Sequence, residues 1–208
     1  MRTVIREGKL ALHFAEGWQA VKWDEQAWYR DGNALGGCVK GMDVVALGPD
    51  GQHWWIELKD CLGYEVENLP RLTEESPAEV KQANAWLENQ GWQGQVQAKR
   101  KKPFIGDELL EKLVGTVAGL AAAARQASQD ARAQEVAAFA TAHTPGGAWS
   151  IALVLTWTHP DMRDYARMAK LLKTKLDQRL RAFGVCCYVV NETVAAPQQP
   201  WTVERVAS

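Results

Sequence analysis

Residues 41–60 read GMDVVALGPDGQHWWIELKD and are the most clearly patterned part of the chain. Its two ends, residues 41–47 and 53–59, are rich in β-branched and bulky apolar side chains. Between them, the GPDG run at residues 48–51 consists of residue types that favour tight turns. The pattern predicts a β-hairpin, which is the clearest local element in the chain.

Charged residues stand on both strands of this predicted hairpin. Side chains alternate along a strand, so Glu57 and Lys59 project from the same face, about 7 Å apart. If Asp43 faces them, its carboxylate and that of Glu57 converge on a hard divalent cation, with the Leu58 carbonyl as a further oxygen ligand. Mg²⁺ or Mn²⁺ suits this set, and Lys59 would orient the attacking water or stabilise the developing anion. The hairpin therefore predicts a metal-dependent hydrolytic site.

The spacing alone has little power, because Glu-x-Lys also occurs at residues 7–9 and 79–81. Only residues 57–59 end an apolar strand that follows a second strand carrying an acidic residue, Asp43. The alternative interpretation is a solvent-facing hairpin with an incidental Glu and Lys pair, which would contribute only a few tenths of a kcal/mol.

Hydrophobic periodicity and turn residues predict the other elements. The expected strands span residues 10–14, 149–157 and 185–190, and the expected helices span residues 78–90, 107–120, 131–142 and 163–183. Asp107 is placed to cap the second of these helices, residues 62–76 read as a solvated loop, and residues 18–29 stay open between helix and loop. The last strand, helix and strand form a βαβ unit, which predicts a parallel pair.

Length and composition are those of one globular domain over residues 1–208, with 47% hydrophobic and 24% charged residues. A net charge of -1 offers no bulk electrostatic argument for nucleic-acid binding. The four cysteines have no CxxC spacing, so zinc and disulfide frameworks are disfavoured. The charged start of the chain, and apolar runs too short for a bilayer, predict a cytoplasmic protein with no membrane partner.

In this setting Asp43, Glu57 and Lys59 resemble the signature of the PD-(D/E)XK nuclease superfamily, an acidic residue on one strand and Glu-x-Lys on the next. The segments KWDEQAWYR, KGMDVVAL and WWIELKDC resemble an uncharacterised bacterial group within it. The resemblance implies an α/β fold with a restriction-endonuclease-like core, in which helices flank a mixed central β-sheet. Met42 replaces the proline of the motif, which is often absent in the superfamily.

A third carboxylate is expected for such a site. The upstream helix that often supplies a glutamate in the superfamily is not evident here. This position is open between Asp24 and Glu25, with Glu16 behind them. Asp24 is taken as the candidate catalytic residue, against a capping or surface role.

Two basic stretches are candidate phosphate contacts. The run Lys99, Arg100, Lys101 and Lys102 could bind phosphates without reading sequence, or could be a solvated loop. The helix at residues 163–183 has a basic polar face for which a solvated role is the default.

These features predict a metal-dependent phosphodiesterase, an endonuclease for DNA or RNA with DNA favoured. The alternative is an inactive nuclease-like module that binds nucleic acid or a protein partner in a defence or toxin-related system. The small residues Gly115, Gly119 and Ala123 allow close helix packing, either on the sheet or on a second subunit. A homodimer and an operon-encoded protein partner both remain open.

Overall fold

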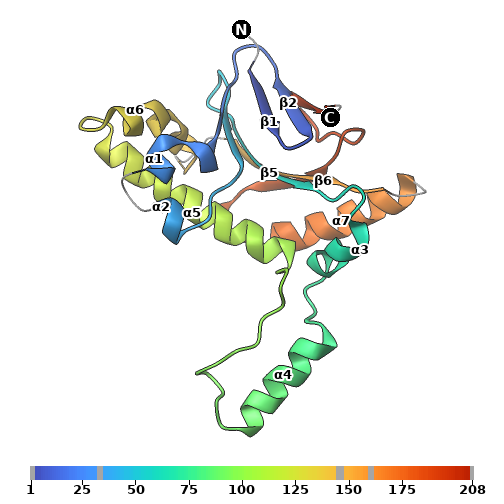
Figure 1. The fold of residues 1–208 in the computed structure, drawn as a ribbon. Helices are drawn as coiled ribbons and strands as arrows, with labels where there is room; N and C mark the ends of the chain where they lie inside the picture. The colour runs from blue at the N-terminus through green and yellow to red at the C-terminus, as the bar shows by residue number, and fades with distance from the viewer. Residues whose placement is uncertain (1–2, 32–34, 144–147, 159–161, 207–208) are drawn as a thin grey trace.

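A five-stranded mixed sheet runs through the middle of the computed structural model, which describes residues 3–31, 35–143, 148–158 and 162–206 (Figure 1). In spatial order its strands are β3 (Gln19–Lys22), β4 (Val44–Leu47), β5 (His53–Asp60), β6 (Trp149–Thr156) and β7 (Cys186–Val190). The first three strands pair antiparallel, and the last three pair parallel. The expected α/β class and mixed sheet are therefore confirmed.

The predicted hairpin is confirmed as β4 and β5. Val44 pairs with Ile56 at one end of the register, and the Gly48 N–H donates to the Gln52 carbonyl at the turn, 2.8 Å away. Gly51 has a φ of 70°, a left-handed conformation that glycine adopts without strain. The local turn chemistry thus fixes the register that aligns the two strands.

Two long helices cover one face of the five-stranded sheet (Figure 1). They are α5 (Ile105–Gln126), between β5 and β6, and α7 (Met162–Arg179), between β6 and β7. Each helix links two parallel strands, as the crossover geometry requires. The predicted βαβ unit is confirmed, and buried side chains such as Trp55 and Leu113 fill the space between sheet and helices.

A three-stranded antiparallel sheet covers the other face. It consists of β1 (Val4–Glu7), β2 (Leu10–Phe14) and β8 (Trp201–Arg205). The Trp201 ring meets the Trp54 ring of β5 edge-on, with centroids 6.0 Å apart. Because side chains alternate along β5, Trp54 and Ile56 pack on this small sheet while Trp55 and Glu57 face the helices.

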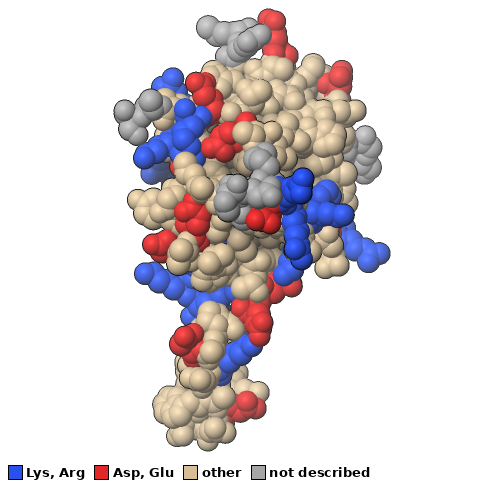
Figure 2. Space-filling view, turned by 90° about the vertical axis from the view of Figure 1, so that its right-hand side faces the viewer, with Lys and Arg blue, Asp and Glu red and all other residues tan. Residues whose placement is uncertain are grey.

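An arm projects from the body between β5 and α5, as two views show (Figures 1 and 2). The chain leaves the body through α3 (Glu65–Asn68) and the 3₁₀ turn η2 (Leu69–Leu72), which lie beside α7, and the arm itself carries α4 (Ala78–Asn89). The helix predicted over residues 78–90 is confirmed, but the expected loop at 62–76 is wrong in part, since α3 and η2 form there. Every residue of α4 is described, and none of them is buried.

Asp107 does not cap α5, which corrects the sequence prediction. The helix begins two residues earlier, at Ile105, directly after the buried Phe104. Asp107 therefore lies in the first turn, where its negative charge interacts favourably with the positive end of the helix dipole. Its carboxylate also pairs with Arg179 at 2.7 Å.

The remaining elements are short. The open segment at residues 18–29 contains β3, the turn η1 and the start of α1. The short helices and 3₁₀ turns outside the segments described above are η1 (Trp23–Glu25), α1 (Ala27–Arg30), α2 (Leu35–Cys38), α6 (Ala131–Ala137), η3 (Ala138–His143) and η4 (Arg181–Phe183). Within the described ranges, no helix has the length and apolarity needed to cross a membrane.

Candidate functional site

Asp43 is held just before β4 by contacts from three directions. Its carbonyl accepts a hydrogen bond from the Trp23 N–H at 3.0 Å, and its Oδ2 accepts one from the Leu58 N–H of β5 at 2.7 Å. The preceding Met42 N–H donates to Thr116 Oγ1 of α5 at 2.8 Å. These bonds fix the Asp43 carboxylate between the end of the hairpin and α5.

Glu57 and Lys59 lie on the same face of β5, as the strand alternation predicted. The Glu57 side chain is 1% exposed and faces the helix layer. Lys59 Nζ lies 2.6 Å from Glu57 Oε1 and 3.0 Å from Glu108 Oε1 of α5. Lys59 thus bridges a strand carboxylate and a helix carboxylate.

Lys112 of α5 joins the two predicted metal ligands. Its Nζ lies 2.7 Å from Asp43 Oδ1, 2.7 Å from Glu57 Oε1 and 2.8 Å from Glu57 Oε2. The two carboxylates therefore converge on one position, and their nearest oxygens are no farther apart than twice that distance. We refer to Asp43, Glu57, Lys59, Glu108 and Lys112 as the charged cluster.

Burial and neighbouring charges set the protonation of the cluster. Burial and the Asp43 charge raise the pKa of Glu57 to about 7, against the opposing effect of the two lysines. Burial works to lower the pKa of Lys112, but the charges of Glu57 and Asp43 raise it overall. Lys112 therefore stays cationic, as a counter-ion for the two carboxylates.

Glu108 connects the cluster to the base of the arm. Its Oε2 accepts a hydrogen bond from Arg71 of η2, while its Oε1 contacts Lys59. Burial works to raise the pKa of Glu108, but the Lys59 and Arg71 cations lower it overall. The result is an unbroken chain of ionic contacts from Glu57 through Lys59 and Glu108 to the arm.

Asp24, the candidate third carboxylate, lies in η1 near Asp43. Burial, followed by the charge of Asp43, raises the pKa of Asp24. Its Oδ1 is buried and has no hydrogen-bond partner among the described residues. Asp24 therefore acts on the cluster through its charge.

The two other carboxylates considered for the third position have different surroundings. Glu25 pairs with Lys22 of β3. Glu16 is exposed in the turn after β2, at the rim of a hollow that Thr202 of β8 also lines.

The oxygens of Asp43, Glu57 and Leu58 supply some of the ligands that a hard cation needs. Among the described residues, no group of three or more His, Cys, Asp or Glu side chains is arranged to hold a metal ion. Asp43 and Glu57 nevertheless converge, and the Leu58 carbonyl shares the strand edge from which the Leu58 N–H reaches Asp43. Carboxylate and carbonyl oxygens are the kind of ligands that Mg²⁺ and Mn²⁺ prefer, but in this structure the Lys112 ammonium lies between the two carboxylates.

The basic run at residues 99–102 lies in the segment that returns from the arm to α5. The Arg100 guanidinium donates to the carbonyls of Pro70 and Thr73, at 3.1 and 2.7 Å, and thereby closes the base of the arm. Lys102 donates to Asn68 Oδ1 at 3.2 Å, whereas Lys99 and Lys101 are exposed. Two of the four predicted phosphate contacts thus already hold the arm.

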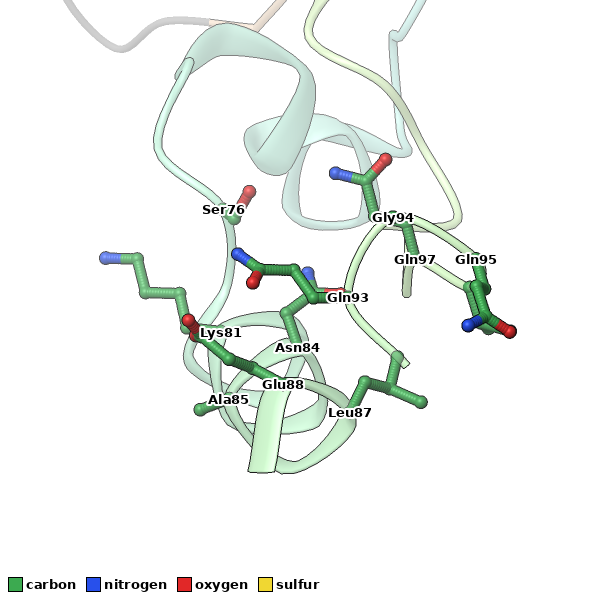
Figure 3. Close-up of a pocket in the computed structure, with 11 residues that line it drawn as sticks. Ser76, Lys81, Asn84, Ala85, Leu87, Glu88, Gln93, Gly94, Gln95 and Gln97 are labelled. Carbon is green, nitrogen blue, oxygen red and sulfur yellow. The ribbon is translucent and has the colours of Figure 1, made fainter. Parts of the chain in front are cut away.

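A hollow on the arm is separate from the charged cluster. Figure 3 shows Asn84, Gln93 and Gln97 among the residues around it, and none of its lining residues belongs to the cluster. The Asn84 side chain exchanges two hydrogen bonds with the backbone of Ala98, which tie the returning segment to α4.

Sequence reasoning missed Lys112 and Glu108. Lys112 lies three residues after Leu109 and four before Thr116, both of which are buried. A lysine at the spacing of a buried helix face is a signal, since lysine is rarely buried without a partner. Glu108, four residues before Lys112, lies on the same side of α5.

Comparisons of the chain with protein-family models, with curated proteins and with solved structures find no match. The geometry of the charged cluster is therefore the basis for a functional proposal.

Proposed function

We propose that this protein is a divalent-metal-dependent phosphodiesterase, an endonuclease that cleaves nucleic acid, with DNA favoured over RNA. The observation that carries the proposal is the convergence of Asp43 and Glu57 on one cation position, 2.7 Å from each carboxylate. Lys59 stands beside that position, 2.6 Å from Glu57. Two carboxylates can hold a metal ion that activates a water, and an ammonium beside them can stabilise the charge that develops on the phosphate.

The arrangement of the fold supports the same proposal. An antiparallel hairpin carries the acidic residues, and a parallel βαβ unit completes the sheet with helices against it. This is the order expected of a restriction-endonuclease-like core, the finer fold that the motif resemblance implies.

Each residue of the site has a chemical role in this proposal. Asp43, Glu57 and the Leu58 carbonyl would hold Mg²⁺ or Mn²⁺. When bound, the ion supplies a water of lowered pKa and stabilises charge on a phosphoryl oxygen. The Lys59 ammonium orients the attacking water or stabilises the developing anion, and Asp24 adds negative charge beside Asp43.

One observation favours a second candidate, a nuclease-like module without activity that binds nucleic acid or a protein partner. Lys59 and Lys112 supply two positive charges to the carboxylates of Asp43 and Glu57. Such a network can be purely structural, because the lysines already neutralise the carboxylates and no metal ion is needed. A second copy of the chain or a partner in a defence system would fit this candidate.

Cleavage assays distinguish the two candidates. Purified protein is incubated with supercoiled DNA, linear DNA or RNA in Mg²⁺ or Mn²⁺, with EDTA as the metal-free control. Asp43→Ala and Glu57→Gln should each reduce cleavage by about 10²-fold or more, because each removes a ligand of the ion. Glu111→Gln is the matched control, since Glu111 is an exposed carboxylate of α5 that pairs with Lys40.

The enzyme proposal fails if none of the substrates is cleaved in either metal. It also fails if cleavage occurs but Glu57→Gln and Glu111→Gln retain equal activity, because the reaction would then take place at another site.

A further inference from the structure

We propose that Lys112 is a built-in cation that occupies the metal position, so that a divalent ion binds only when the Lys112 ammonium moves away from Asp43 and Glu57. The inference rests on the proposed function, because it concerns the regulation of the same site. It makes metal binding an exchange of one cation for another.

The contacts of Lys112 show why the two cations compete. Its Nζ makes three contacts of 2.7 to 2.8 Å with the oxygens of Asp43 and Glu57. Mg²⁺ binds oxygens at about 2.1 Å, so an ion shared by these carboxylates would lie almost where the ammonium nitrogen lies. Like charges at such a separation repel strongly away from bulk water.

The backbone of α5 is held in place, so the exchange of cations requires movement of the Lys112 side chain. The Thr116 hydroxyl donates to the Lys112 carbonyl at 2.9 Å and accepts from the Met42 N–H. A Cβ at Gly115 would lie 2.1 Å from the Lys40 carbonyl oxygen, which shows how closely α5 approaches the segment before Asp43. Only the flexible four-carbon stem of Lys112 can turn away.

Glu108 offers the displaced ammonium a new partner. It precedes Lys112 by four residues, the spacing at which a glutamate and a lysine meet on one helix face. Its two oxygens already contact Lys59 and Arg71, but a carboxylate has about four acceptor sites, and the charge of Glu108 acts on Lys112 through space. The ammonium therefore leaves one carboxylate pair for another carboxylate, and does not remain unpaired in a partly buried place.

Removing the charge of Lys112 should strengthen metal binding. Without the ammonium, Asp43 and Glu57 face each other with Lys59 as their remaining counter-ion within the cluster. A divalent ion then relieves their repulsion without first displacing an ammonium. The affinity gain should be about tenfold or more, because the interaction of buried charges is weakly screened.

The test is calorimetric titration of Mn²⁺ into the wild-type protein, Lys112→Met and Lys40→Met. Lys112→Met should lower the Kd by about tenfold or more. Lys40→Met is the matched control, because it removes an exposed lysine that pairs with Glu111, a neighbour of Lys112 on α5. Its Kd should equal the wild-type value. Thermal unfolding should show a larger rise in Tm on Mn²⁺ addition for Lys112→Met than for the wild type.

If Lys112→Met does not fold, as judged by circular dichroism, Lys112→Gln replaces it. The glutamine amide still donates a hydrogen bond to a carboxylate but carries no charge, and the same gain in affinity is expected. Equal Mn²⁺ affinity in the wild type and the folded uncharged variant would overturn the role of Lys112 while leaving the metal site intact. Failure of every folded variant to bind Mn²⁺ would overturn the metal site and this inference together.

Discussion

At the scale of single residues, the site depends on two lysines that contact the same glutamate from different elements. Lys59 approaches Glu57 along β5, and Lys112 approaches it from α5. Only Lys112 also contacts Asp43, so only Lys112 lies between the two proposed ligands. Replacing Lys112 should therefore change the Mn²⁺ affinity, whereas replacing Lys59 should change the cleavage rate.

Lys59→Met should slow cleavage by about 10²-fold or more, because it removes a cation that stabilises charge in the transition state. Mn²⁺ affinity should not fall, since the ligands Asp43 and Glu57 remain. The measurements are the single-turnover cleavage rate at saturating metal and the Kd for Mn²⁺. A loss of Mn²⁺ binding that parallels the loss of rate would mean that Lys59 mainly holds the site together.

At the scale of elements, the approach of α5 to the residue 39–43 segment decides whether the cluster forms. Gly115 meets the Lys40 backbone, and a Cβ at Gly119 would lie 2.7 Å from the Trp23 ring. The predicted close packing of the small residues on α5 thus takes place within the chain.

Gly115→Ala should lower the free energy of unfolding by about 1–3 kcal/mol, because the added methyl group meets a backbone oxygen that cannot turn aside. It should also weaken Mn²⁺ binding, by shifting α5 relative to Asp43. Urea denaturation and calorimetric titration measure the two effects. Gly37→Ala is the control, since a Cβ there meets no atom within 4 Å. Equal free energies of unfolding for Gly115→Ala and Gly37→Ala would contradict the close contact between Gly115 and the Lys40 carbonyl.

The end of β5 is also tied to the small sheet. Asp60 accepts hydrogen bonds from Arg205 of β8 at 3.0 and 2.8 Å. These bonds lower the pKa of Asp60 to about 2 from its ordinary value of 3.8, against the opposing effect of burial. The stabilisation is therefore complete above pH 3.8 and is lost as the pH falls toward 2.

Asp60→Asn should destabilise the protein at pH 7 by about 1 kcal/mol or less, since the ion pair is partly exposed to solvent. The difference from the wild type should shrink as the pH falls below 3.8. Urea denaturation at several pH values measures it, with Asp50→Asn in the exposed hairpin turn as the control for charge loss. A difference that stays constant down to pH 2 would exclude the ion pair as its cause.

At the scale of the whole molecule, the arm stands apart from the packed layers (Figures 1 and 2). No residue of α4, which is described throughout, is buried, and an isolated helix of this length is marginal in water. Arg100 and Arg71 act at the base of the arm, not along α4. The core should therefore fold without the projecting part.

Replacing residues 77–97 by a short Gly-Ser linker should change the Tm by less than about 2 °C, because no buried side chain is removed. The replacement keeps Arg71 and Arg100 at the base. Thermal unfolding measures the Tm, and the cleavage assay then reports whether the arm contributes to substrate binding. A large fall in Tm would show that the arm stabilises the core.

Features that depend on near neighbours in the chain could be predicted from the amino-acid sequence. Strand alternation placed Glu57 and Lys59 on one face, and the turn at residues 48–51 aligned their strand with the one that follows Asp43. Helical periodicity likewise identified α5 and α7, because each buries an apolar stripe at a regular spacing.

Contacts between distant segments could not be predicted from local patterns, because they form only when the chain packs. The strands β1, β3 and β8 are short, and β8 exists through its pairing with β2 from the other end of the chain. The periodicity of α5 does not say that Lys112 reaches Asp43 and Glu57, since that contact depends on the depth to which the helix packs. The local pattern thus provides the carboxylates, and the packing of α5 decides which cation lies between them.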